Sequence, residues 1–386
     1  GGASAVFAGC IKAATEYRDT HNWIFMLLPV AGVLIVFMYE RIGRQDGGTN
    51  QVLATIKSKD DVPFLSAPLI FVSTLLTHLT GGSAGREGAS IQFGGSIGNW
   101  LGKLAHLDEF DHHVMIMCGM SAAFAAVFGT PMAAAVFAME VVSVGVMYYA
   151  ALLPCVIAAI IAAEFATGMG IDPETFPVHS IPGLTVETGL KMALIAVGCG
   201  ILSILFCILL KIVGQLYTKY LKNPYIRIVV AAGVIILIPI CLNTKDYMGA
   251  GSGLIARAIE NGEAGPLDFL WKMLLTALTM RAGYRGGEIV PAFSVGATFG
   301  CVAGGILGFS PELAAAAGMV ALFCGVTNCP ITAMLISFEL FGFSGAAYYL
   351  IAISISYAVS GYYSLYKDQT IVYSKYKARY INRKTR

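Results

Sequence analysis

Long apolar runs with almost no charged residues follow one another through most of the chain. They cover residues 23–39, 62–79, 114–127, 132–147, 150–163, 190–212, 226–242, 269–280, 291–307, 313–326 and 346–363. Only 12% of the 386 residues are charged, against about a quarter in soluble domains. Several runs fall short of the roughly 20 residues that a perpendicular membrane helix needs, and Gly or Pro interrupts many. We therefore predict an all-α membrane protein with short, tilted and broken transmembrane helices.

Basic residues gather at the C-terminal end of the chain. Residues 367–386 hold seven Lys or Arg and one Asp. The positive-inside rule places this end in the cytoplasm, and a contact with anionic lipid is compatible with that placement. We expect a multi-pass protein of the cell membrane, in a bacterium the plasma membrane, with lipid as a partner and no nucleic acid. No secretory signal precedes the first apolar run, and the chain opens on Gly1, so we expect a trimmed native start.

The Cys and His residues form no recognisable metal or redox motif. The nine cysteines include no CxxC pair, and the six histidines show no ligand spacing, so we expect no metal and no cofactor. The apolar runs also lack the Ser–His, Asp–Asp or His-Glu-x-x-His patterns of intramembrane proteases, and the chain has no P-loop. These patterns argue against an enzyme and against an ATP-driven pump, and leave a lipid-interacting scaffold as the non-transport alternative.

The two halves of the chain resemble each other at a nearly constant offset. Residues 48–56 align with 251–259, and single residues align as Gly85, Gly94 and Gly98 with Gly287, Gly296 and Gly300, and as Pro131 and Glu140 with Pro330 and Glu339. Three matches in one order indicate a duplicated architecture. If each half crosses the membrane an odd number of times, the second half is inverted, which is typical of transporters. A parallel repeat is the alternative.

The repeat suggests a division of the chain into four parts. We expect a first transmembrane repeat at residues 1–166 and a second at 189–366. A polar, proline-rich linker at 167–188 would join them. Residues 367–386 would form the basic cytoplasmic tail.

Three glycine-rich segments, at residues 46–50, 81–90 and 283–291, each precede a predicted helix. A helix start presents unpaired N–H groups and about half a positive charge, and glycine lets an ion approach those groups closely. Such starts, meeting near the middle of the membrane, would bind an anion weakly enough to release it. The sequence therefore predicts an anion pathway built from broken helices.

Glu87 lies in the second of these segments. A carboxylate inside a membrane protein indicates function, and at a helix start it would compete with an anion for the same N–H groups. Protonation would release the side chain, so we predict that Glu87 gates the pathway and couples anion movement to proton movement. The alternative is a local Arg86–Glu87 ion pair at the membrane surface, although adjacent residues rarely face one another on a helix.

Three further glutamates belong to the broken or apolar segments. Glu288 is either a proton carrier or an interfacial residue near Arg281 and Arg285, and we favour the carrier. Glu140 and Glu339 share one repeat position near the ends of apolar helices. For both we favour a structural role, as helix caps or buried polar partners.

Residues 85–88, Gly-Arg-Glu-Gly, resemble the GREGP motif of the CLC family of chloride channels and proton-coupled anion antiporters. Residues 287–291 resemble the GxFxP motif of that family, and residues 47–50 stand where its GSGIP segment lies. The resemblance extends from the first apolar run to about Arg379. It implies the CLC-type inverted repeat and a homodimer with one pore per subunit.

The resemblance also assigns roles by position. It makes Glu87 the external gating glutamate, places the amides of Glu288 and Ile289 at the central anion site, and puts Tyr366 where the pore tyrosine of the family lies. Segment 47–50 offers no serine, which the family has there. The anion-binding residues that we expect are Gly85, Arg86, Gly88, Gly287, Ile289, Tyr366, Gly47, Gly48, Thr49 and Asn50.

Departures from the family pattern favour one branch of it. Ala89 replaces the proline of GREGP, Val141 stands where chloride/proton antiporters carry an internal glutamate, and residues 286–291 read GGExxP. Together with the missing serine, these features resemble the fluoride/proton antiporters, in which the GGE glutamate is implicated in the mechanism, although Val290 replaces a threonine. We predict export of fluoride in exchange for protons. The alternative is a chloride-selective antiporter or a passive chloride channel.

Overall fold

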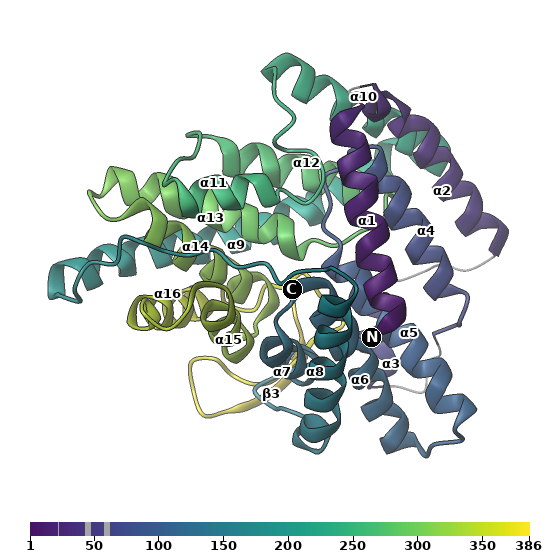
Figure 1. Cartoon of the computed structure of the whole chain (residues 1–386), viewed down its shortest axis with the longest axis horizontal. Coiled ribbons are helices and arrows are strands. Elements are labelled where there is room, and N and C mark those ends of the chain that lie inside the picture. The colour runs from purple at the N-terminus through teal and green to yellow at the C-terminus, as the bar shows by residue number, and fades with distance from the viewer. Residues whose placement is uncertain (22, 43–47, 58–61) are drawn as a thin grey trace.

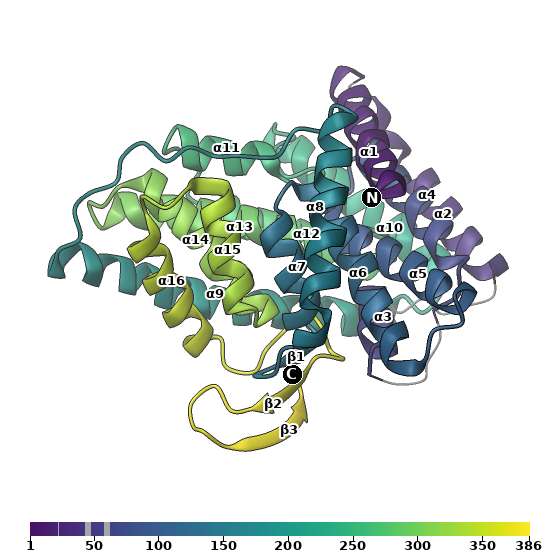
Figure 2. The ribbon, with the colours of Figure 1, turned by 60° about the horizontal axis from the view of Figure 1, so that its bottom comes forward.

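The computed structural model describes residues 1–21, 23–42, 48–57 and 62–386, which form sixteen α-helices and a small sheet (Figures 1 and 2). The helices are α1 (Gly2–Thr20), α2 (Leu28–Ile42), α3 (Thr49–Thr55), α4 (Ser66–Leu79), α5 (Glu87–Leu104), α6 (Glu109–Phe128), α7 (Pro131–Glu140), α8 (Leu152–Gly168), α9 (Val186–Tyr220), α10 (Pro224–Leu242), α11 (Ser252–Glu260), α12 (Asp268–Ala282), α13 (Ile289–Ile306), α14 (Pro311–Thr327), α15 (Pro330–Phe341) and α16 (Ala346–Val359). The strands are β1 (Ser143–Val144), β2 (Thr370–Tyr373) and β3 (Tyr380–Lys384), and 3-10 turns at Ile24–Leu27 and Tyr149–Ala151 lead into α2 and α8.

The described helices differ widely in length, as the interrupted apolar runs predict. Six segments are long and apolar enough to cross a membrane, and five shorter apolar helices have only 10–17 residues. Among the long ones, α8 and α10 are mostly exposed on the surface of the chain, whereas α13 is mostly buried. Since exposed apolar helices need lipid or a partner around them, α8 and α10 belong at the periphery and α13 belongs at the centre.

The helices fall into two sets of eight, α1–α8 and α9–α16, that follow the same order along the chain. Equivalent helices begin at positions that the sequence alignment pairs. α7 begins at Pro131 and α15 at Pro330, while α5 begins at Glu87 and α13 at Ile289. In Figure 1 the first set lies mostly at the right and the second mostly at the left, with α10 packed on α2. The duplicated architecture is therefore present in the fold.

A pair of glutamates joins the two repeats reciprocally. Glu140, at the end of α7, accepts hydrogen bonds from the backbone N–H groups of Ile331 (3.0 Å) and Thr332 (2.8 Å) at the start of α15. Glu339 of α15 accepts from the N–H groups of Met132 and Ala133 at the start of α7, both at 2.9 Å. Each carboxylate therefore caps the helix to which the other belongs, where a negative charge complements the helix dipole. The capping role that the sequence favoured is confirmed.

Replacing Glu339 with Gln tests how much this exchange stabilises the fold. The amide keeps one acceptor but loses the charge and the second acceptor, so we expect a loss of about 1–2 kcal/mol and a lower melting temperature in detergent. Glu164→Gln, on the exposed surface of α8, is the control and should leave the melting temperature unchanged. Equal melting temperatures for Glu339→Gln and the wild type would contradict the capping role.

Glycines bring helices of each repeat into backbone contact. Gly94 of α5 and Gly119 of α6 lie so close that a Cβ atom on either would meet the carbonyl oxygen of the other. Gly296 of α13 and Gly318 of α14 form the equivalent contact in the second repeat. Because apolar side chains gain little by leaving lipid for protein, close backbone packing of this kind is how such helices associate.

Two helices differ from the sequence prediction. α1 precedes the first apolar run and was not expected, because Lys12 and Glu16 lower its hydropathy, yet its Phe7 and Ile11 pack in a buried cluster with residues of α4 and α5. α9 has 35 residues, longer than the run at 190–212, because no proline interrupts it before Pro224. A search for apolar runs therefore detects neither the amphipathic helix α1 nor the full length of α9.

Residues 367–386, which the sequence predicts to be a basic tail, contribute two strands to a three-stranded sheet. β2 and β3 form an antiparallel hairpin, and β2 pairs in parallel with β1, which directly follows α7. The buried Gln369 donates to the carbonyl oxygens of Val141 (2.9 Å) and Thr327 (2.7 Å), one in each half of the chain. The basic residues of this segment are therefore attached to the helical body, and a short sheet is added to the predicted all-α fold.

Candidate functional site

The starts of α5 and α13 meet at the centre of the molecule. The N–H of Gly85 donates to the carbonyl oxygen of Gly287, and the N–H of Gly287 donates to that of Gly85, both at 2.7 Å. These two residues occupy the same position in the two repeats, so the reciprocal pair lies on the approximate two-fold axis between them. We call it the inter-repeat bridge. Sequence analysis expected both residues to bind an anion. In this structure each N–H donates to the carbonyl oxygen of the other glycine, and anion binding by the pair stays a prediction.

Glycine is required at the bridge because backbone touches backbone there. A Cβ atom on Gly287 would lie 2.5 Å from the nitrogen and 2.8 Å from the Cα of Gly88. A Cβ on Gly88 would lie 2.8 Å from the Cα of Gly287. The two helix starts are therefore closer than side chains would permit, and the next N–H groups along each helix, beginning at Gly88 and Ile289, are brought to the same region.

Glu87 is the first residue of α5 and is only 1% exposed. Its Oε2 atom accepts from the backbone N–H of Arg86 at 3.0 Å, and its Oε1 atom lies 3.4 Å from the Nε of Arg86. The local ion pair that the sequence argument disfavoured therefore exists, because the Glu87 side chain turns back to accept from the backbone N–H of the N-cap residue Arg86. Glu87 is buried in this pair, whereas the side chain of Arg86 is 17% exposed.

Arg86 contacts a second carboxylate that the sequence analysis did not select. Its Nη2 atom lies 2.8 Å from the Oε1 of Glu174, in the extended segment between α8 and α9. The sequence placed Glu174 in the linker without a role. An acidic residue in a proline-rich stretch does not indicate which distant residue it will contact. Sequence alone could therefore not have predicted this ion pair.

A cavity of about 810 Å³ lies beside the bridge and brings most of the remaining predicted residues together. Gly48, Thr49, Asn50, Glu288 and Tyr366 all line it, whereas Gly47 lies outside the described residues. Its lining also carries five cationic side chains, from Lys211, Arg281, Arg285, Lys367 and Arg386. A cavity with this excess of positive charge concentrates small anions.

Two side chains at the start of α3 bond from this cavity to other parts of the chain, one to the start of α5 and one to the C-terminal segment. Thr49 donates its hydroxyl to the carbonyl oxygen of Gly88 at 3.0 Å. Asn50 accepts at its Oδ1 atom from the N–H of Asp368 at 3.4 Å. This hydrogen bond occupies the amide oxygen of Asn50. The Nδ2 donors of Asn50 have no acceptor among the described residues.

Tyr366 and Glu288 contribute from the second repeat. Tyr366 is 3% exposed; its N–H donates to the Ser364 hydroxyl at 3.1 Å, and its carbonyl oxygen accepts from the Thr385 hydroxyl at 2.7 Å. The Tyr366 hydroxyl has no hydrogen-bond partner among the described residues, whereas the Glu288 carboxylate accepts from its own backbone N–H and lies near the charge of Arg281. The cavity therefore holds a hydroxyl donor and a carboxylate near the start of α13.

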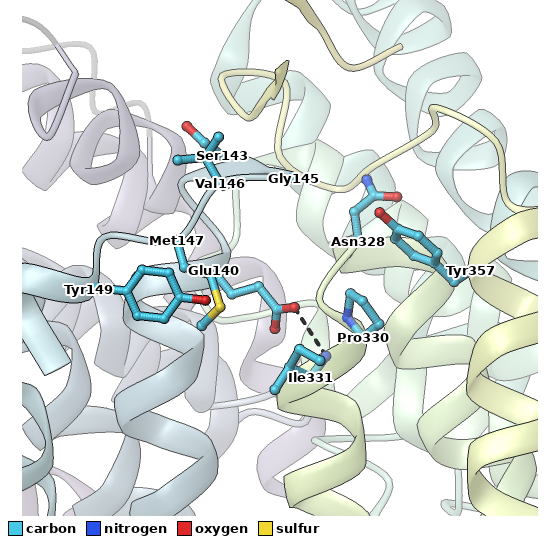
Figure 3. Close-up of a pocket in the computed structure, with 10 residues that line it drawn as sticks. All are labelled: Glu140, Ser143, Gly145, Val146, Met147, Tyr149, Asn328, Pro330, Ile331 and Tyr357. Carbon is cyan, nitrogen blue, oxygen red and sulfur yellow. Dashed lines mark hydrogen bonds between the residues drawn. The ribbon is translucent and has the colours of Figure 1, made fainter. Parts of the chain in front are cut away.

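A second pocket, of about 500 Å³, lies where α7 meets α15 beside β1 (Figure 3). Glu140 points across it toward the N–H of Ile331, while Asn328 and Tyr357 lie on its opposite side. The Glu140 oxygens are already occupied by the cap of α15, and no Lys, Arg or His is among the described residues that line the pocket. We therefore assign it to the junction between the repeats and not to the anion pathway.

Residues 31–361 match a family model described as voltage gated chloride channel. The chain belongs to this CLC family. A crystal structure of a CLC-type fluoride/proton antiporter superposes with a TM-score of 0.90 at 31% identity, covering 95% of this chain and 93% of that one. The fold is therefore the CLC-type inverted repeat, and the parallel-repeat alternative is set aside.

Other CLC relatives differ in the anion that their names give. A protein of Pseudomonas syringae pv. tomato named "Chloride/fluoride channel protein" is 34% identical over 97% of this chain and 85% of its own length. The "H(+)/Cl(-) exchange transporter ClcA" of Vibrio cholerae is 29% identical, over 66% of this chain and 58% of its own. A slow cyanobacterial Cl-/H+ antiporter shares the fold, with a TM-score of 0.80 at 18% identity.

Proposed function

We propose that this chain exports fluoride in exchange for protons, with Glu87 as the gate and proton acceptor. The observation that carries the proposal is the inter-repeat bridge, which brings two dipole-positive helix starts together with a buried carboxylate at one of them. An anion and the ionised Glu87 side chain require the same N–H donors, so they exclude one another. Protonation neutralises Glu87, so its side chain no longer competes with the anion for those N–H donors.

Fluoride suits the donors of this site. Fluoride is small and strongly hydrated, and compact N–H and O–H groups replace its water better than a wide apolar pore does. The free Nδ2 of Asn50 and the free hydroxyl of Tyr366 supply such donors from two sides of the cavity. The names of the CLC-type fluoride/proton antiporter and of the Pseudomonas protein support the same anion.

Glu288 is the second acidic group that we propose for the mechanism. Its carboxylate lines the cation-rich cavity, close to the charge of Arg281. It stands directly before the first turn of α13. We propose that it carries protons between the cavity and the bridge, the role that the GGE pattern suggested.

Chloride transport is the second candidate, because two of the similar proteins carry chloride in their names. Purified protein in liposomes, with fluoride and chloride electrodes and a pH indicator inside, separates the two. We expect fluoride efflux to exceed chloride efflux at least ten-fold and to drive protons in the opposite direction. Chloride flux equal to fluoride flux would end the fluoride proposal, and fluoride flux without proton movement would indicate a channel.

Several features of the assembly belong to the same proposal. We propose a homodimer in the cell membrane of a bacterium, with lipid around the exposed apolar helices and the C-terminal end in the cytoplasm. The expected repeats at 1–166 and 189–366 with the linker at 167–188 are proposed as its structural units. The transporter character of the CLC family supports a role in transport and not in catalysis.

A further inference from the structure

The guanidinium group of Arg86 lies between two carboxylates. Its Nη2 atom is 2.8 Å from Glu174, whereas its Nε atom is 3.4 Å from Glu87, so the linker acid has the shorter contact. The side chains of Arg86 and Glu174 are 17% and 25% exposed, and that of Glu87 is 2% exposed. The three groups therefore form a line from the surface of the chain to the buried start of α5.

The linker around Glu174 is held in place on both sides. Pro173 packs on the turn between α6 and α7, where a Cβ on Gly129 would lie 2.6 Å from the Cα of Pro173. The buried Phe176 donates its N–H to the carbonyl oxygen of Leu340, at the end of α15, at 2.9 Å. Glu174 is therefore fixed against both repeats, and its contact with Arg86 is not a chance encounter of two mobile side chains.

Other basic side chains lie near this line on neighbouring elements. His78, at the end of α4, is buried, and its carbonyl oxygen accepts from Nη1 of Arg18 of α1 at 3.1 Å. Lys272 of α12 is fully buried and donates to the hydroxyl of Ser83, on the loop leading to Glu87, at 3.1 Å. These neighbouring side chains are basic and do not compete for Arg86. Among the described residues, Glu87 and Glu174 are the acids that form ion pairs with Arg86.

We infer that Glu174 is a positioning residue that draws Arg86 away from Glu87 and so lets the gate open. This inference rests on the proposed function of Glu87. With Glu174 present, the Arg86 charge is divided, and its contact with Glu87 stays long. Without Glu174, the planar guanidinium is free to bind both oxygens of Glu87, because bidentate pairing is its preferred geometry. The ionised gate would then remain seated longer and slow each transport cycle.

Glu174→Gln in liposomes tests the inference. We expect the maximal transport rate to fall about ten-fold with an unchanged KM for the anion, the size of one added charge-assisted hydrogen bond on the seated carboxylate. Glu174→Asp keeps the charge on a shorter side chain and should restore part of the rate. Asp172→Asn, exposed on the same linker, is the matched control and should transport like the wild type.

A double-mutant cycle with Arg86→Gln shows whether Glu174 acts through Arg86. In the Arg86→Gln protein, adding Glu174→Gln should cause no further loss of rate. An equal ten-fold loss in both backgrounds would overturn the inference, and so would a wild-type rate for Glu174→Gln. All rates are measured with the anion that the wild type transports fastest. If that anion is not fluoride, the fluoride proposal fails, but the ratios of variant to parent rates still test the role of Glu174.

Discussion

Glu87→Gln is expected to reduce proton uptake driven by a fluoride gradient to the level of protein-free liposomes. The amide has nearly the same shape as the carboxylate, but it neither binds nor releases a proton between pH 4 and pH 9. The substituted side chain therefore cannot alternate between a charged form that occupies the N–H donors and a neutral form that leaves them. Proton movement should be lost completely, while the fold stays intact because the replacement is isosteric.

The measurement needs a control that separates this effect from a general loss of carboxylates. Glu164→Gln changes an exposed glutamate on α8 and should keep both fluoride efflux and proton uptake. Size-exclusion profiles of the two variants should coincide with the wild type. If Glu87→Gln took up protons at the wild-type rate, Glu87 would not be the proton acceptor and the proposed mechanism would fail.

Gly287→Ala is expected to separate the two repeats at their centre. The added Cβ atom would lie 2.5 Å from the Gly88 nitrogen, and its neighbours are backbone atoms that cannot rotate away. Relieving the clash stretches both 2.7 Å hydrogen bonds of the inter-repeat bridge. Overpacking and the weakened bonds together should cost about 3 kcal/mol or more. Transport should fall at least ten-fold, because the N–H donors around Glu87 lose their arrangement.

The same helix supplies the control for this substitution. Gly305 lies near the end of α13, and a Cβ atom there would meet no atom within 4 Å. Gly305→Ala should therefore leave transport unchanged and raise stability slightly, by about 0.5–1 kcal/mol, since alanine favours helix. Equal melting temperatures and transport rates for the two variants would show that the close approach at Gly287 has no importance.

The repeat was the part of the fold that the sequence predicted best. Gly85 and Gly287 align because both sites need a residue without a side chain, and only glycine meets that need. Glu140 and Glu339 align for a similar reason, since each must cap the other repeat. The alignment identified equivalent positions but not that equivalent positions touch, because contact across a two-fold axis is a property of the packed chain.

Other parts of the site depended on tertiary packing and could not be read from the sequence. Glu174 meets Arg86 only because Pro173 and Phe176 pack against distant helices. Residues 367–386 read as a charged tail because basic residues dominate their composition, yet hydrogen bonds from Gln369 attach them to both halves. In each case a short polar segment gained its structure from partners more than 30 residues away.

The reciprocal contacts between the repeats also bear on how the protein behaves within the lipid bilayer. Two bonds at the bridge and the exchanged caps of Glu140 and Glu339 oppose any rocking of one half against the other. We therefore expect each transport cycle to proceed through movements of a few side chains, Glu87 among them, with little change in the outline that the protein presents to lipid. A transporter of this kind exchanges ions without displacing its annular lipids, so stiffening or thinning of the membrane should alter its speed little.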